Sequence, residues 1–241
     1  MDELNIEKQD GVWVLKMNRP TKHNALNTAL TQQLLQTLQD ADATSECRAI
    51  VLTGTGPSFC AGADTSEFRG FQDDRGGALR RADLTTSVHK SFSRLAKPVV
   101  AAVHGNALGG GAGLAIACDM VIAESSTRFG YPELKHGICP AIVMANLTRQ
   151  LAPKKAFELV STGRLLNGQD MVDWGLANQC ATGRDQVLQL ALDVAAQWAA
   201  YSVYAVSATK RLFHRCADLG LMEGLACGHD TNVMMRSFPR D

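Results

Sequence analysis

The segment 104–114, with the sequence HGNALGGGAGL, decides the fold prediction for this chain. The apolar run 98–103 before it is typical of a buried strand, and the alanine-rich run 114–118 after it is typical of a buried helix. Glycines between a strand and a helix let a ligand approach bare backbone N–H groups, and the helix N-terminus adds partial positive charge. We therefore expect a ligand here that carries or develops negative charge.

These glycines do not form a nucleotide-binding motif. A phosphate-binding loop would continue with Lys-Ser or Lys-Thr, and a dinucleotide fingerprint would space its glycines as GxGxxG; neither pattern occurs here. Two uses remain. The glycines form an oxyanion hole, in which fixed N–H donors stabilise an oxygen that becomes negative during a reaction, or they form a tight turn that serves packing only.

A second loop of the same kind lies earlier in the chain. Residues 49–53, AIVLT, predict another buried strand, which leads into the small residues of 54–64, GTGPSFCAGAD. A short helix is expected to begin near residues 66–68. Two loops of this kind can each contribute one N–H group to a single oxygen atom.

Five motifs together resemble the enoyl-CoA hydratase/isomerase (crotonase) superfamily, in the family's order and at its spacing. They are NRPTKHNAL at 18–26, FCAGAD at 59–64, ALGGG at 107–111, Cys-Asp at 118–119 and FGYPE at 129–133. The resemblance implies an acyl-CoA thioester as substrate, whose carbonyl oxygen becomes an enolate. It also implies that Ala63 and Gly110 carry the two N–H donors.

The resemblance further implies which residues contact the substrate: Lys22, Ala25, Ala61, Gly62, Asp64, Thr65, Leu108, Gly109, Pro132 and Ala141. Asp64 is expected to hold the shape of its loop or to contact CoA. Lys22 is expected near the CoA phosphates, unless it is an ordinary solvated lysine. Ala141 is expected to offer a backbone N–H that helps to hold water. No cofactor is implied, because coenzyme A is part of the substrate.

The chain departs from the family pattern at Gly113. Family hydratases typically hold one water between two glutamates, of which this chain keeps the second, Glu133, while Gly113 stands at the position of the first. One base suffices to move a double bond between C3 and C2. Hydration, by contrast, would lack one of the two glutamates that usually hold the water. We expect Glu133 to be the catalytic acid/base of an enoyl-CoA hydratase/isomerase. An isomerase without hydration, a non-catalytic acyl-CoA binder and another reaction through the same enolate remain open.

Other side chains have simpler explanations. Glu67 replaces the missing carboxylate only if its helix turns inward, and His136 and Cys139 line the pocket only if they do more than pack a turn. Asp119 is expected to be structural. No metal site is expected, because the six histidines show no HxH or HxxxH pairing, and no GxSxG nucleophile motif occurs.

Composition fits one globular domain with a small-molecule substrate. The 241 residues include 24 Lys plus Arg and 24 Asp plus Glu, so no net charge favours nucleic acid. No apolar run is long enough to span a membrane, and no secretion signal is evident. The seven cysteines form no CxxC pair, which is typical of free thiols in a cytoplasmic protein.

Strands alternate with helices to about residue 130, and the pattern beyond 140 is mostly helical, which predicts an α/β fold with a largely parallel sheet. The resemblance implies a crotonase-like ββα spiral over residues 1–190. Residues 191–241 would form a helical region that mediates assembly of a homotrimer or a hexamer (a dimer of trimers). We expect residues 69–81, rich in charge and glycine, to form a mobile loop over the acyl tail. Because the chain ends sooner than many members, we expect weaker CoA binding or help from a neighbouring subunit.

Overall fold

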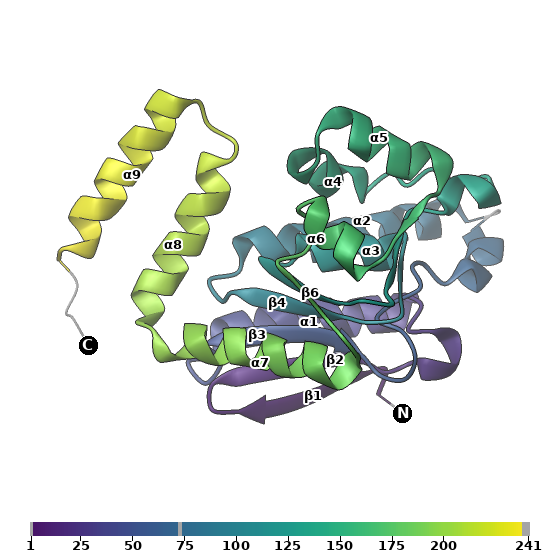
Figure 1. Ribbon diagram of the computed structural model, residues 1–241, viewed down its shortest axis with the longest axis horizontal. Coiled ribbons are helices and arrows are strands. Elements are labelled where there is room, and N and C mark those ends of the chain that lie inside the picture. Colours follow the sequence, from purple (N-terminus) through teal and green to yellow (C-terminus); the bar gives the residue numbers. More distant parts are fainter. Residues whose placement is uncertain (1, 72–73, 238–241) are drawn as a thin grey trace.

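The computed structural model describes residues 2–71 and 74–237 and has an α/β architecture (Figure 1). Its main sheet has the strand order β1-β2-β3-β4-β6-β9. These strands are β1 (Leu4–Gln9), β2 (Val12–Met17), β3 (Ala49–Gly54), β4 (Val99–Val103), β6 (Met120–Glu124) and β9 (Gln179–Ala181). Only the β1–β2 hairpin within this sheet is antiparallel, so the prediction of a largely parallel sheet is confirmed.

Both faces of the main sheet are covered by helices. One face packs against α1 (Thr28–Ala43), α2 (Arg75–Arg94) and α3 (Gly110–Ala117), and the other packs against α7 (Arg184–Ala200). Strand β2 shows why: Leu15 and Met17 join the core under α1, whereas Val12 and Val14 pack with the alanines of α7. Alternate side chains of a strand point to opposite faces, so a strand that is apolar on both faces needs cover on both.

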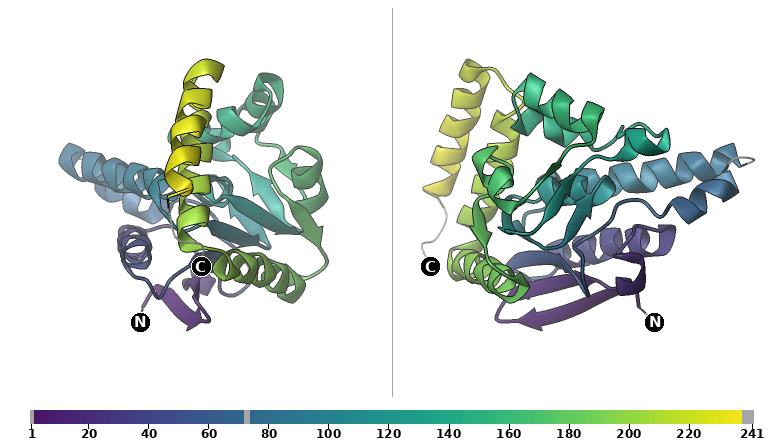
Figure 2. Two further views of the ribbon diagram at one scale, coloured as in Figure 1. Left: turned by 90° about the vertical axis from the view of Figure 1, so that its left-hand side faces the viewer. Right: turned by 45° about the vertical axis from the view of Figure 1, so that its right-hand side comes forward.

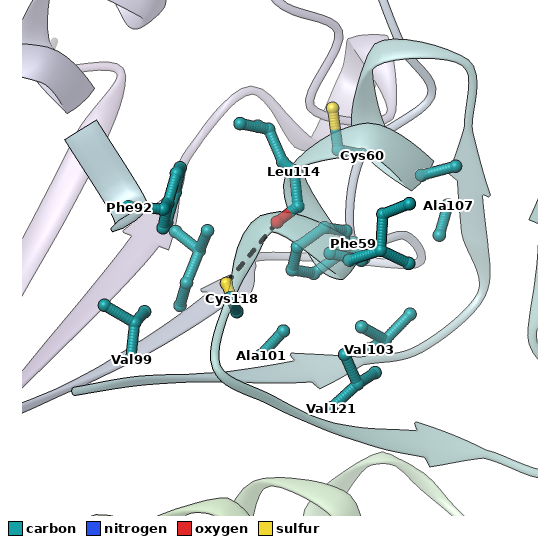
Figure 3. Close-up of a cluster of buried hydrophobic side chains, with 14 of the residues drawn as sticks. Phe59, Cys60, Phe92, Val99, Ala101, Val103, Ala107, Leu114, Cys118 and Val121 are labelled. Carbon is teal, nitrogen blue, oxygen red and sulfur yellow. Dashed lines mark hydrogen bonds between the residues drawn. The ribbon is translucent and has the colours of Figure 1, made fainter. Parts of the chain in front are cut away.

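A second, three-stranded sheet carries the glycine-rich segment. It consists of β5 (Asn106–Leu108), β7 (Arg128–Gly130) and β8 (Leu165–Leu166), with β5 and β7 parallel. Below α3 lies the apolar core drawn in Figure 3, where Phe59 and Leu114 are fully or almost fully buried. The glycine-rich turn between β5 and α3 is therefore held on a rigid base.

The remaining helices complete the second half of the chain. They are α4 (Met144–Gln150), α5 (Pro153–Thr162), α6 (Gly168–Asp173), α8 (Val203–Cys216) and α9 (Leu221–Met235). Helices α8 and α9 pack side by side and project from the core, as the views in Figure 1 and Figure 2 show. The domain boundary expected at residue 190 falls inside α7, so the projecting part begins only at α8.

Two sequence predictions are wrong in detail. Residues 75–81 are not a loop: α2 begins at Arg75, because the Asp74 side chain accepts from Gly77 N–H at 2.8 Å and caps the helix. Residues 72–73 of the expected loop lie outside the described residues, as do residues 238–241 at the C-terminal end. Helix α3 starts at Gly110 rather than at 114, and a Cβ atom on Gly111 or Gly113 would clash with its neighbours.

A membrane-spanning segment is not found in the described part of the chain. None of the helices within residues 2–71 and 74–237 combines enough length with enough apolar character to cross a bilayer. The same residues contain no cluster of three or more side chains able to hold a metal ion.

Candidate active site

The loop of residues 59–64 is fastened to β5 by a short parallel bridge at Cys60. Its N–H donates to Asn106 O at 2.9 Å, and Leu108 N–H donates to Cys60 O at 3.0 Å. The Cys60 side chain is fully buried, and burial raises the pKa of its thiol to about 12. Cys60 therefore anchors the loop and is not a nucleophile.

A second parallel bridge sets the direction of the Ala63 backbone. Leu26 N–H donates to Gly62 O at 2.7 Å, and Asp64 N–H donates to Leu26 O at 3.0 Å. In this parallel bridge Leu26 bonds to Gly62 and Asp64, the residues before and after Ala63. The N–H of Ala63 itself therefore faces away from Leu26. This leaves one donor of the loop available for a ligand.

Gly110 brings a second N–H to the same place. A Cβ atom on Gly110 would lie 3.8 Å from Ala63 N. Because Gly110 is the first residue of α3, no earlier helical carbonyl lies in position to accept its N–H. Within the described ranges, neither N–H donates to a protein acceptor. The two donors expected from the sequence are thus adjacent and unpaired.

Glu133 reaches this region from β7. Gly130 lies opposite Leu108 in the β5–β7 pair, and Gly109 N–H donates to Gly130 O at 2.8 Å. The chain turns at Pro132, and Glu133 begins the short helix η3 (Glu133–His136). Its carboxylate lies against Gly109, the residue before the Gly110 donor.

The Glu133 carboxylate is partly buried and incompletely hydrogen-bonded. Its Oε2 atom is buried and has no hydrogen-bond partner among the described residues, and burial raises the pKa of the carboxyl group. The buried hydroxyl of Tyr131 likewise lacks a partner there, and burial together with the charge of Glu133 raises its pKa. A carboxylate with a raised pKa beside free N–H donors is suited to general acid/base catalysis.

Gly113 lies one helical turn beyond Gly109, since its N–H donates to Gly109 O at 2.9 Å. A Cβ atom there would lie 2.4 Å from Val143 Cγ1 and 3.0 Å from His89 Cε1. The space next to Gly113 is therefore filled by Val143 and by His89, a residue of α2 that sequence reasoning did not single out. No motif marks His89, because its position depends on how α2 packs against α3.

Asp64 and Arg19 hold the loop that carries Ala63. Arg19 Nη1 donates to Asp64 Oδ2 at 2.9 Å and also to Ala25 O at 2.5 Å. Ser66 Oγ donates to Asp64 Oδ1 at 2.6 Å, and this bond, with those from Arg19, lowers the pKa of Asp64. Asp64 therefore holds the shape of its loop, one of the two roles expected for it.

The other expected contact residues lie on the same elements. Ala61 N–H donates to His23 O at 2.9 Å, and Thr65 begins the helix η2 (Thr65–Phe71) directly after Asp64. Lys22 is exposed at the end of the helix η1 (Pro20–Lys22). The structure thus joins the 19–26, 59–65 and 107–110 segments through backbone hydrogen bonds, and Glu133 lies beside Gly109 in the last of them.

Two expectations fail on the contacts that the structure shows. Ala141 N–H donates to Cys139 O at 2.8 Å, so it is occupied within its own turn. Glu67 does not replace the missing carboxylate, because it accepts from Thr28 N–H at 2.9 Å at the start of α1 and pairs with Arg81. His136 and Cys139 are exposed.

The chain is similar in sequence and in structure to enoyl-CoA hydratases. Residues 7–237 match the family model described as enoyl-CoA hydratase/isomerase. A probable enoyl-CoA hydratase of Rhizobium meliloti (strain 1021) is 37% identical over 226 residues, 93% of this chain and 86% of that protein. The 2,3-dehydroadipyl-CoA hydratase of Escherichia coli (strain K12) is 34% identical over 227 residues, 94% of this chain and 87% of that protein. The crystal structure of an enoyl-CoA hydratase from Mycobacterium smegmatis gives a TM-score of 0.94 at 28% identity, covering 99% of this chain and 93% of that one.

Proposed function

Because the chain belongs to the enoyl-CoA hydratase/isomerase family, we propose that it binds an enoyl-CoA thioester and transfers protons through Glu133. The observation that carries this proposal is the buried, unpartnered oxygen of Glu133 beside two unpaired N–H groups, those of Ala63 and Gly110. The names of the relatives, which are mostly enoyl-CoA hydratases, support the substrate class.

The two N–H groups receive the thioester carbonyl oxygen. Negative charge develops on this oxygen when a proton leaves the neighbouring carbon or when water adds at C3. Donors that are already in place stabilise the enolate without reorganisation, and the loss of one such donor typically lowers kcat about 100- to 1,000-fold. The bridges at Cys60 and Leu26 supply this rigidity.

Glu133 then acts as the acid/base. In isomerisation it removes a proton from C2 of a 3-enoyl-CoA and returns it to C4, so that the double bond moves to C2–C3. In hydration it accepts a proton from water as the water oxygen bonds to C3, and it delivers a proton to C2. Both reactions leave Glu133 as a carboxylate, and neither requires a cofactor besides the CoA of the substrate.

Self-association through α8 and α9 is part of the proposal. Several apolar side chains of these helices are largely exposed, among them Phe213, Leu221, Met222 and Leu225. Exposed apolar patches of this kind mark contact surfaces. The assembly that we propose is a homotrimer or a dimer of trimers.

Product analysis in heavy-oxygen water tests the reaction. Wild-type protein and the Glu133→Gln variant are given trans-2- and trans-3-enoyl-CoA, and the products are resolved by chromatography and mass spectrometry. We expect one labelled oxygen in the product of the 2-enoyl substrate and conversion of the 3-enoyl substrate to the 2-enoyl isomer. The variant should bind acyl-CoA but lose about 100- to 10,000-fold in turnover.

Three other outcomes would change the conclusion. Isomerisation without labelled product would leave an isomerase only. Binding of acyl-CoA by the wild type without any turnover would favour a non-catalytic binder. Turnover by the Glu133→Gln variant at the wild-type rate would remove Glu133 from the mechanism.

A further inference from the structure

His89 carries a buried imidazole for which the described part of the chain offers no partner. Both ring nitrogens are shielded from solvent, and neither makes a hydrogen bond to protein there. Buried polar groups normally have partners, so such a group calls for an explanation. Glu133 Oε2 and Tyr131 OH, at or near the candidate site, are buried without a partner in the same way. Each of these groups could accept or donate a hydrogen bond to a polar ligand or to water.

Glu133 lies against Gly109 and His89 against Gly113, two residues that the hydrogen bond from Gly113 N–H to Gly109 O (2.9 Å) joins at the start of α3. Glu133 Oε1 is 2.7 Å from the Cβ position of Gly109, and His89 Cε1 is 3.0 Å from the Cβ position of Gly113. A water that bridges two groups spans up to about 5–6 Å, since each of its two hydrogen bonds is about 2.8 Å long.

The chemistry of His89 suits the holding of a neutral water. Burial lowers the pKa of His89 to about 4, so the ring is neutral at physiological pH. A neutral imidazole has one N–H donor and one nitrogen that accepts a hydrogen bond. Its surroundings include the methyl groups of Val143, which compete for no hydrogen bond.

We propose that His89 is the second polar group of the active site and holds, together with Glu133, the water that adds to the substrate. It occupies the space that opens because residue 113 has no side chain. This inference rests on the proposed function and adds to it: it favours hydration in a chain that lacks one of the two usual carboxylates.

His89 stays neutral throughout the proposed hydration reaction. The unprotonated nitrogen of the ring accepts a hydrogen bond from the water and orients its oxygen toward C3. The water oxygen bonds to C3, its proton passes to Glu133, and the C2–C3 electron pair moves to the thioester oxygen held by Ala63 and Gly110. Glu133 then protonates C2, which yields the 3-hydroxyacyl thioester and restores the carboxylate.

Isomerisation provides an internal control, because it needs no bound water. Loss of the imidazole should therefore impair hydration much more than isomerisation. A merely structural His89 would instead affect both reactions alike, through a shift of α2 against α3. The ratio of the two rates separates these two roles.

The test compares the variants His89→Leu and His89→Gln with the wild type in both reactions. Leucine fills the space without polar atoms, whereas glutamine keeps a donor and an acceptor. We expect His89→Leu to lower kcat for hydration about 100-fold, with KM and the isomerisation rate within about threefold of wild type, and His89→Gln to recover part of the loss. The Tm of His89→Leu should stay close to that of the wild type, because leucine fills the space and no hydrogen bond to a described protein group is lost.

Phe92→Leu is the matched control on the same helix, since Phe92 is buried beneath α3 (Figure 3). It should lower Tm and leave the ratio of hydration to isomerisation unchanged.

Hydration by His89→Leu at the wild-type rate would overturn the inference, as would an equal loss of both reactions. If Tyr131→Phe loses hydration while His89→Leu keeps the wild-type hydration rate, Tyr131 rather than His89 holds the water. Glu133→Gln distinguishes the two proposals: if it remains active, the proposed function itself fails, whatever the His89 variants do.

Discussion

Glu133 Oε1 lies 2.7 Å from the point where a Cβ atom on Gly109 would be. Position 109 must therefore lack a side chain for the Glu133 carboxylate to lie where it does. Gly109 also has φ +52°, a left-handed conformation that residues with a Cβ adopt at a cost. The close approach of Glu133 and the backbone conformation thus both require glycine at position 109.

Gly109→Ala should abolish most activity and lower stability modestly. The new methyl group displaces the Glu133 carboxylate, and we expect kcat to fall at least about 100-fold. Backbone strain should cost about 1 kcal/mol of unfolding free energy. Gly175→Ala is the control, because Gly175 has φ +78° but no neighbouring atom within 4 Å of its Cβ position. It should show the stability loss without the activity loss; full activity in Gly109→Ala would contradict the placement of Glu133.

The rate of the proposed reaction should depend on pH through Glu133. The base must be ionised, and burial raises its pKa above the ordinary value of 4.5, so kcat/KM should fall on the acid side at a pH above that value. The same shift makes ionised Glu133 destabilising: its contribution to unfolding free energy decreases as the pH rises through the range between the two pKa values. A pH profile of kcat/KM checks the sign. An acid limb at or below pH 4.5 would show that Glu133 is solvated or is not the base.

The local sequence predicts a glycine-rich turn with N–H groups available to a ligand, whereas the choice of Ala63 and Gly110 as donors and of Glu133 as acid/base came from the resemblance to the family. A strand that ends in glycines and enters a helix places N–H groups at its turn, whatever surrounds it. The bridges at Cys60 and Leu26, which align the two loops, join segments far apart in the chain and follow only from the resemblance or the structure.

His89, by contrast, carries no local signal. Its role depends on the absence of a side chain at Gly113 and on the contact between α2 and α3, neither of which changes the sequence pattern around His89. Glu67 shows how a non-local contact decides such a case. It would replace the missing carboxylate only if its helix turned inward, but Thr28 N–H at the start of α1 is a donor without a helical partner, and Glu67 accepts from it at 2.9 Å.

Self-association should depend on the apolar side chains at the start of α9. Leu221 and Met222 are 78% and 72% exposed. The double variant Leu221→Glu, Met222→Glu should shift the protein from trimer or hexamer to monomer in light scattering after size exclusion, because buried charges oppose association. Phe157→Glu on α5, where Phe157 is 70% exposed, is the matched control and should leave the assembly intact. A monomeric wild type, or a double variant that still assembles, would count against α9 as the interface.

Lys210 should be needed to fasten α8 to the sheet. Its ammonium group is buried and donates to Asp119 Oδ2 at 2.7 Å and to Lys97 O at 2.9 Å. Lys210→Met removes the cation and leaves the Asp119 carboxylate without its closest charge partner, although His214 still lies 3.0 Å from Asp119 Oδ1. Removal of one member of a buried pair typically costs about 3–5 kcal/mol, measurable by urea unfolding. Lys210→Met with Asp119→Asn should recover part of this loss, because the remaining unpaired charge is gone. If the single variant unfolds at the wild-type urea concentration, the pair does not fasten α8, and its packing against the rest of the chain must be apolar.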